Sequence, residues 1–101
     1  MAQAQRLLLH QILETFTENV YFQPPNNIQL EYPCIIYKRD LVDTKFANDK
    51  PYNHTKRYIV TVIDRDPDSE IPDKVAAMPM SLFNRFFTAD NLNHDVYSVY
   101  F

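Results

Sequence analysis

The spacing of apolar positions predicts a helix at the start of the chain. Between residues 3 and 16, apolar side chains recur every three or four positions and fall on one side of a helix. The members of this stripe are Leu8, Leu9, Ile12, Leu13 and Phe16. His10 lies beside the stripe, and because no second ligand sits one turn away we interpret it as a surface residue.

Further along the chain, short apolar runs and alternating patterns predict strands. The expected strands cover residues 20–23, 32–39, 57–64, 81–90 and 94–101. In the third of these, both faces are apolar. One face carries Tyr58, Val60 and Val62, and the other carries Ile59, Thr61 and Ile63. That strand is therefore expected at the centre of a sheet.

Two more segments complete the pattern of elements. A short helix is expected at about residues 70–78, with Asp68 or Ser69 as its N-cap and Pro79 after its end. A polar segment covers residues 40–56 and is interpreted as an extended loop or a loose hairpin.

The order of these elements predicts one α+β domain over residues 1–101. Its sheet is expected to be mainly antiparallel, because the last two strands form a hairpin across the turn at residues 90–94. The N-terminal helix and the second, short helix are expected to pack on one face of that sheet.

The chain contains no glycine among its 101 residues, which excludes several kinds of site. Phosphate loops, dinucleotide-binding turns and glycine nucleophile elbows all need glycine where the backbone turns tightly. Positions with positive φ then fall to asparagine or aspartate. The asparagines expected at turns are Asn26, Asn27, Asn48, Asn53, Asn91 and Asn93.

The net charge and the single cysteine make several classes of protein function less suitable for this chain. A net charge of -3 without any basic block gives little support for nucleic-acid binding. The lone Cys34 lies in an apolar run and is expected to be a small buried side chain rather than a nucleophile. Since no apolar run is long enough to span a membrane and no signal peptide is recognised, we expect a protein made and used inside a cell.

The acidic stretch after the central strand is the strongest candidate for chemistry. Asp64, Asp66 and Asp68 match the first acidic positions of a calcium loop, but Ser69 stands where that loop needs glycine and Val75 where it needs glutamate. We therefore interpret these carboxylates as the solvated exit of a strand and the start of a helix. The expectation that follows is no metal, no cofactor and no enzymatic activity.

The second half of the chain resembles small proteins encoded in the structural gene clusters of tailed bacteriophages and prophages. The stretches that carry this resemblance are KRYIVTVIDRDPDSEIPDKVAAMP and FNRFFTADNLNHDVYSVYF. The N-terminal helix and VYFQPP also fit, so the resemblance covers most of the chain. Within those clusters the chain is most similar to the tail terminator family, also called tail completion or tail-to-head joining proteins.

This resemblance implies an α+β subunit of a hexameric ring in the neck of the virion. Such a ring caps the tail tube, ends its polymerisation and joins the tail to the head connector. The implied partners are further copies of the chain, the tail tube protein and the head-tail connector or stopper protein. Genomic DNA would pass through the lumen without specific binding, no membrane would be involved, and assembly would take place in the host cytoplasm.

Two other interpretations remain open at this point. One is a different neck component, such as a head-tail stopper or a connector adaptor, and the other is a small intracellular metal-dependent enzyme built on the acidic turn. For the ring, contacts between subunits or with partners are expected from the long polar segment and from the acidic turn with two arginines. These residues are Asp43, Lys45, Phe46, Lys50, Tyr52, Asp64, Arg65, Asp66, Asp68 and Arg85.

Overall fold

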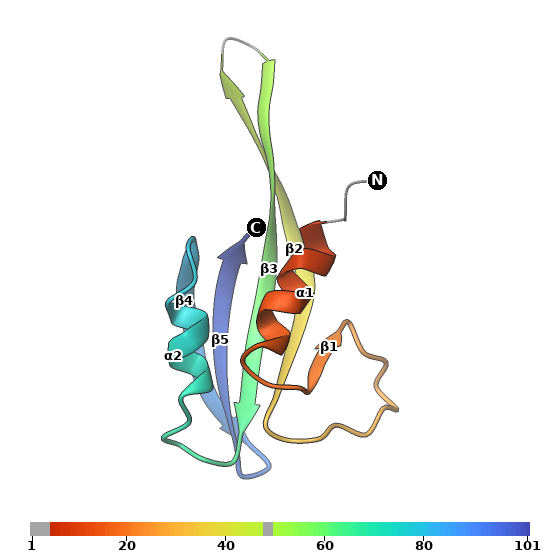
Figure 1. Ribbon diagram of the computed structural model, residues 1–101, viewed down its shortest axis with the longest axis vertical. Helices are drawn as coiled ribbons and strands as arrows, with labels where there is room; N and C mark the ends of the chain where they lie inside the picture. Colours follow the sequence, from red (N-terminus) through yellow and green to blue (C-terminus); the bar gives the residue numbers. More distant parts are fainter. Residues whose placement is uncertain (1–4, 48–49) are drawn as a thin grey trace.

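The computed structural model describes residues 5–47 and 50–101, with side chains described outside residues 41–55. Two helices and five strands follow one another along the chain (Figure 1). In order they are α1 (Gln5–Glu14), β1 (Val20–Phe22), β2 (Cys34–Ala47), β3 (Lys50–Asp64), α2 (Ile71–Ala76), β4 (Ser81–Ala89) and β5 (Leu92–Tyr100).

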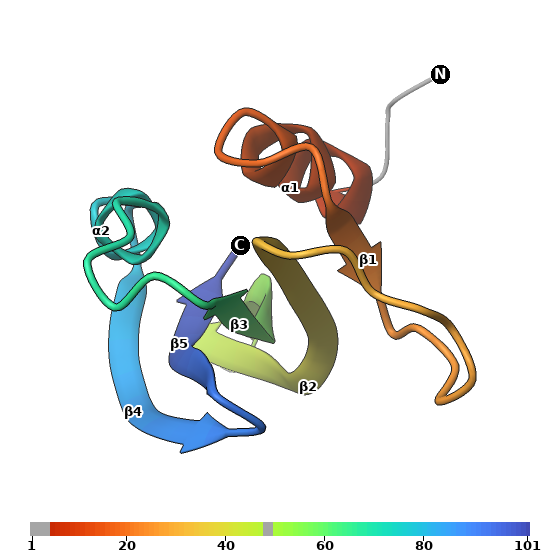
Figure 2. The same ribbon diagram turned by 90° about the horizontal axis from the view of Figure 1, so that it is seen from below.

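The five strands form one sheet in the order β1-β2-β3-β5-β4. Every neighbouring pair is antiparallel except β1 with β2, so the expectation of a mainly antiparallel α+β domain is confirmed. Strand β3 lies at the centre, as the apolar character of both its faces predicted. Both helices lie on the same face of the sheet (Figure 2), as expected.

The main core lies between this helix-covered face and the two helices. Leu9 and Leu13 of α1 are fully buried, as are Val60 and Val62 of β3 beneath them, and Val75 of α2 completes the layer. Alternation along β3 explains the arrangement, because every second side chain points to the same face. Burying these side chains is the main favourable contribution to folding in a chain this short.

The helices are shorter than the sequence pattern indicated. Ile12, expected in the apolar stripe of α1, is 37% exposed, so the buried stripe consists of Leu9 and Leu13. For α2 the expected N-cap is wrong: Glu70 occupies that position without a side-chain cap, while Ser69 Oγ accepts a hydrogen bond from the Ile71 N–H.

Residues 40–56 form a hairpin rather than an extended loop. Strands β2 and β3 stay paired from Cys34 opposite Ile63 to Ala47 opposite Lys50. Strand β5 pairs only with residues 57–64 of β3, so the distal part of the hairpin lies beyond the rest of the sheet. The segment has few apolar residues and several turn-forming ones, so the sequence alone did not separate a hairpin from a loop.

Fewer asparagines than expected have a positive φ angle. Asn91 has a φ of 63° and Asp90 a φ of 54°, which makes a two-residue turn between β4 and β5. Asn93 instead belongs to β5, and Asn53 belongs to β3. Asn26 and Asn27 lie in a turn without a positive φ, and Asn48 lies outside the described residues.

The two remaining left-handed positions are Gln23 and Met80, with φ angles of 45° and 61°. Each stands next to a strand end, where the chain changes direction at the sheet border. Neither residue type favours this conformation, so tertiary packing rather than local preference determines it.

Candidate functional site

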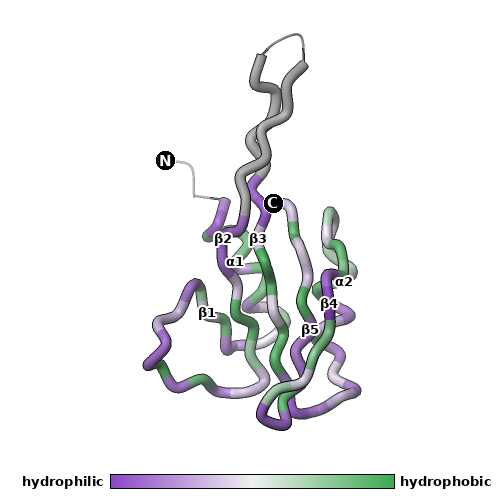
Figure 3. Tube along the Cα trace, turned by 180° about the vertical axis from the view of Figure 1, so that it is seen from behind, coloured by the Kyte–Doolittle hydropathy of each residue, from purple (hydrophilic) through white to green (hydrophobic). Residues whose placement is uncertain are grey.

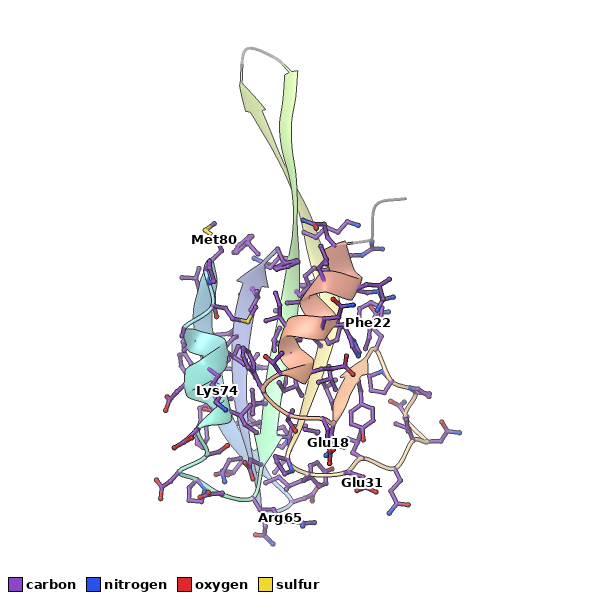
Figure 4. All side chains as sticks on the ribbon, in the orientation of Figure 1. Glu18, Phe22, Glu31, Arg65, Lys74 and Met80 are labelled. Carbon is purple, nitrogen blue, oxygen red and sulfur yellow. The ribbon has the colours of Figure 1, made fainter. Side chains whose placement is uncertain are left out.

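An exposed row of large apolar side chains runs along β4, the edge strand of the sheet. Phe83 and Phe86 are 61% and 53% exposed, and Leu82 is 60% exposed. Met80, just before the strand, is also exposed and lies at the end of the sheet opposite Arg65 (Figure 4). Exposed apolar side chains that lie near one another can mark a contact with another molecule, so this row is a candidate interaction surface.

A bulge between Phe83 and Arg85 distributes these side chains over both faces. Phe83 is opposite Tyr97 and Phe86 is opposite Asp95, so both lie on the helix-covered face, because directly paired residues share a face. Leu82 and Phe87 lie on the other face. Without the bulge, Phe83 and Phe86 would point to opposite sides.

Some of the row is held in place by neighbours on β5. The ring of Phe87 stacks on His94 at 4.5 Å, and the Arg85 guanidinium lies 5.4 Å from the centre of the Phe87 ring. Phe83 contacts Tyr97 edge to face at 5.6 Å. These contacts orient the exposed rings, which lowers the entropy cost of placing them in an interface.

The opposite border of the sheet carries a groove of about 480 Å³. The segment between β1 and β2 forms one wall and the start of β2 forms the other. In both Figures 1 and 2 this segment and β4 lie on opposite sides of the molecule. The apolar lining residues are Pro24, Pro25, Ile28, Leu30 and Ile36.

Basic side chains surround this border. Lys38 and Arg39 line the groove, and Arg39 also lines a smaller neighbouring cavity of about 300 Å³ together with Arg6 and Lys56. Arg6 is held by Phe22, whose ring centre lies 4.6 Å from the guanidinium carbon. The border with the groove is therefore basic, although the whole chain has a net charge of -3.

The acidic turn lies at the end of the sheet where β3 stops. Asp64 Oδ1 accepts a hydrogen bond from the Asp66 N–H at 3.0 Å, and Asp66 Oδ1 accepts one from the Asp68 N–H at 2.9 Å. Asn93 Nδ2 donates to the carbonyl oxygens of Asp64 and Arg65, which ties this turn to the start of β5. Asp64 and Asp66 therefore shape consecutive turns of the backbone.

Two other side chains that could take part in chemistry, those of Cys34 and His10, are partly or fully buried in the fold. Burial raises the pKa of the Cys34 thiol to about 12, and the charge of Asp64 adds to this shift. His10, expected at the surface, is half-buried, and its Nδ1 lies 2.6 Å from the hydroxyl oxygen of Tyr37. Among the side chains that the structure describes, in residues 5–40 and 56–101, no three of His, Cys, Asp or Glu are arranged to hold a metal ion.

The predicted contact residues divide into three groups. The side chains of Asp43, Lys45, Phe46, Lys50 and Tyr52 lie outside the described residues. Asp64, Asp66 and Asp68 lie in the consecutive turns between β3 and α2. Arg65 belongs to the same stretch, and its guanidinium lies 5.5 Å from the ring centre of Tyr32. Arg85 lies on β4, with its guanidinium 5.4 Å from the ring centre of Phe87.

The apolar row of β4 and the groove were not among the predicted contacts. The signal for the row was the pair of apolar doublets Leu82–Phe83 and Phe86–Phe87, which makes both faces of the strand apolar. Such a strand is either central in a sheet or part of an interface. The irregular segment that walls the groove carries no comparable signal.

No model of a known protein family matches the chain, and no curated protein matches it. Among the described helices, none has the length and apolar character needed to cross a membrane.

Proposed function

We propose that this chain is a structural subunit of the neck of a tailed bacteriophage. Its copies form a ring, six-membered by resemblance, that caps the tail tube, stops its polymerisation and joins the tail to the head connector. Its partners are its own copies, the tube protein and the connector or stopper protein. It assembles in the host cytoplasm and remains in the virion.

The exposed apolar row of β4 is the observation that carries this proposal. A chain of 101 residues has little surface to spare, yet three phenylalanines of one strand remain 38–61% exposed. Each aromatic side chain has roughly 150–250 Å² to bury, so the three together leave on the order of 300 Å² uncovered. A protein whose output is assembly needs such a surface, since apolar contacts supply the free energy of association.

The extended hairpin of β2 and β3 gives further support. Its distal part pairs only with itself in the described residues, and an isolated two-stranded ribbon is marginally stable in water. A neighbouring subunit or the tube end would supply the third strand or the packing surface that stabilises such a ribbon. A ring subunit also needs two unlike surfaces, and here β4 and the groove occupy opposite borders of one sheet.

Deleting the gene from its phage and examining the lysate by electron microscopy tests the proposed function. Overlong tails without heads are expected, because nothing would stop the addition of tube subunits. Tails of normal length detached from heads would contradict the proposal and identify a stopper or connector adaptor instead. Normal virions would exclude any neck function, and a tight divalent-ion site found by calorimetry would then favour an enzyme.

A further inference from the structure

The two borders of the sheet are complementary in shape and polarity. Strand β4 presents protruding apolar side chains on one border, and the segment between β1 and β2 forms an apolar groove on the other. Seen from behind, the face that carries Leu82 and Phe87 has no helix over it in the described part of the chain (Figure 3). A partner can therefore reach Leu82 and Phe87 without moving a helix, while Phe83 and Phe86 are exposed on the helix-covered face.

The groove has room for the side chains that β4 offers. A cavity of roughly 150 Å³ holds one benzene ring when lined by aliphatic side chains. The groove has about 480 Å³, so it accommodates more than one phenyl ring. Its wall residue Ile28 is itself 41% exposed, which gives an incoming ring an aliphatic surface to cover.

Charged side chains beside the two surfaces would favour one orientation of the docked copies. Asp90 follows β4, and Asn93 ties the β4–β5 hairpin to the acidic turn, so the β4 border ends in a carboxylate-rich corner. The groove border instead carries Lys38 and Arg39, both exposed. An acidic corner that meets a basic rim favours one orientation of approach and disfavours the pairing of two identical borders.

We propose that β4 of one copy of this chain docks in the groove of a second copy, formed by the β1–β2 segment and the start of β2. The inference rests on the proposed ring, whose subunit contact it names. Because each copy keeps one free β4 and one free groove, the contact repeats head to tail.

A second copy fits these surfaces better than an unrelated partner. Both halves of the contact are present on one chain, at opposite borders of one sheet. Strand β4 is also the last strand of its sheet, so one edge of its backbone has no described strand beside it. Stable interfaces bury about 800 Å² per partner, and the exposed phenylalanines of β4 supply on the order of 300 Å² of that area.

Two variants that each destroy one half of the contact test the proposal. Phe86→Asp places a charge in the apolar row and leaves the groove intact. Ile28→Asp places a charge in the groove and leaves β4 intact. Leu7→Asp is the matched control for Ile28, because Leu7 is 40% exposed on α1 and belongs to neither surface. Circular dichroism and thermal unfolding verify that all three variants fold.

Sedimentation velocity then gives the number of chains in each sample. The wild type and Leu7→Asp are expected to form closed assemblies of several chains, while Phe86→Asp and Ile28→Asp alone remain single chains. Mixing the last two is expected to give complexes of two chains and nothing larger, because one intact β4 meets one intact groove. Raising the salt concentration is expected to weaken this complex, since charges at the rim are screened.

Three results would overturn the proposal. If the mixture stays as single chains while the wild type assembles, the contact is of another kind, such as β4 with β4. If either variant alone assembles like the wild type, the altered surface is not in the contact. If the wild type is a single chain at every concentration, the partner of β4 is a different protein.

These outcomes are separable from the test of the proposed function. Overlong tails after gene deletion combined with single chains in solution would leave the neck function standing and remove this contact. Normal virions combined with two-chain complexes in the mixture would leave this contact standing and remove the neck function.

Discussion

Strands β3 and β4 are both rich in large apolar side chains, but the fold treats them differently. In β3, Tyr58, Val60 and Val62 are at most 1% exposed, whereas in β4 the side chains of Leu82 and Phe83 are about 60% exposed. Strand β3 has a neighbour on each side and helices above it. Strand β4 lies at the border, beside a helix of six residues.

The difference teaches that this chain carries more apolar surface than its own two short helices cover. Natural proteins usually protect an edge strand with charges, proline or a covering element. Strand β4 has Arg85 as its one charged residue and contains no proline. We infer that its cover comes from outside the chain.

Thiol labelling is expected to show the largest difference. Cys34 is fully buried and its pKa is raised to about 12 by burial, so at pH 8 very little of it is thiolate. In dilute, single chains of the variant Leu82→Cys, the new thiol lies on the exposed strand β4 and should react like a free cysteine. Reaction with an aromatic disulfide reagent is expected to be on the order of a thousandfold slower at Cys34. Comparable rates at the two positions would show that the core is open on the timescale of labelling.

Side-chain truncation is expected to cost far more in the core than on β4. Leu13→Ala removes a fully buried side chain and should lower the free energy of unfolding by about 2–5 kcal/mol. Phe86→Ala should lower it by less than about 1 kcal/mol, since the ring is half exposed within one chain. Urea denaturation of dilute, single chains measures both. An equal cost would mean that Phe86 is packed within its own chain.

The polar contact at the border of the core should have an intermediate effect. His10 Nδ1 lies 2.6 Å from the Tyr37 hydroxyl oxygen, and burial raises the pKa of that tyrosine. Tyr37→Phe removes the hydrogen bond and is expected to cost about 0.5–1.5 kcal/mol. A double-mutant cycle with His10→Ala isolates the pair, and a coupling near zero would contradict the contact.

The smallest effect is expected at Asp95, on the helix-covered side of β5. Burial, with help from the charge of Asp73 and against that of His94, raises the pKa of Asp95 above 3.8. Folding therefore favours the protonated carboxyl, so this stabilisation is complete at pH values below 3.8 and is lost as the pH rises through the higher folded-state pKa.

Asp95→Asn should consequently stabilise the fold at pH 7 by up to about 0.5 kcal/mol and lose this advantage near pH 3. Urea denaturation at the two pH values measures the change. Glu31→Gln removes the same charge from an exposed position and serves as the control. Stabilisation of equal size in both variants would point to net charge rather than to the burial of Asp95.

Much of the fold could be predicted from the sequence because alternation is a local signal. The central position of β3 followed from apolar residues on both of its faces, and the helix pattern of α1 located Leu9 and Leu13. The hairpin of residues 40–56 was left open, since a segment with few apolar residues has no apolar face to indicate pairing. Alternation also says nothing about which strand forms the border.

The candidate interaction surfaces were harder to predict for a related reason. One bulge between Phe83 and Arg85 brings Phe83 and Phe86 to the same face, and simple alternation places them on opposite faces. The groove forms where an irregular segment containing Ile28 approaches β2, so its parts are distant in sequence. The contacts expected from the acidic turn were assigned on charge alone, and its carboxylates bond to their own backbone.

Hydrogen exchange of the backbone amides of β4, measured by mass spectrometry at rising protein concentration, tests the central claim most directly. We expect exchange in residues 82–89 and 24–30 to slow together as chains assemble, while residues 57–63 of the core strand β3 are protected at every concentration. Slowing in neither segment, although sedimentation shows the chains to be assembled, would contradict the claim that β4 is completed by the groove of a second copy.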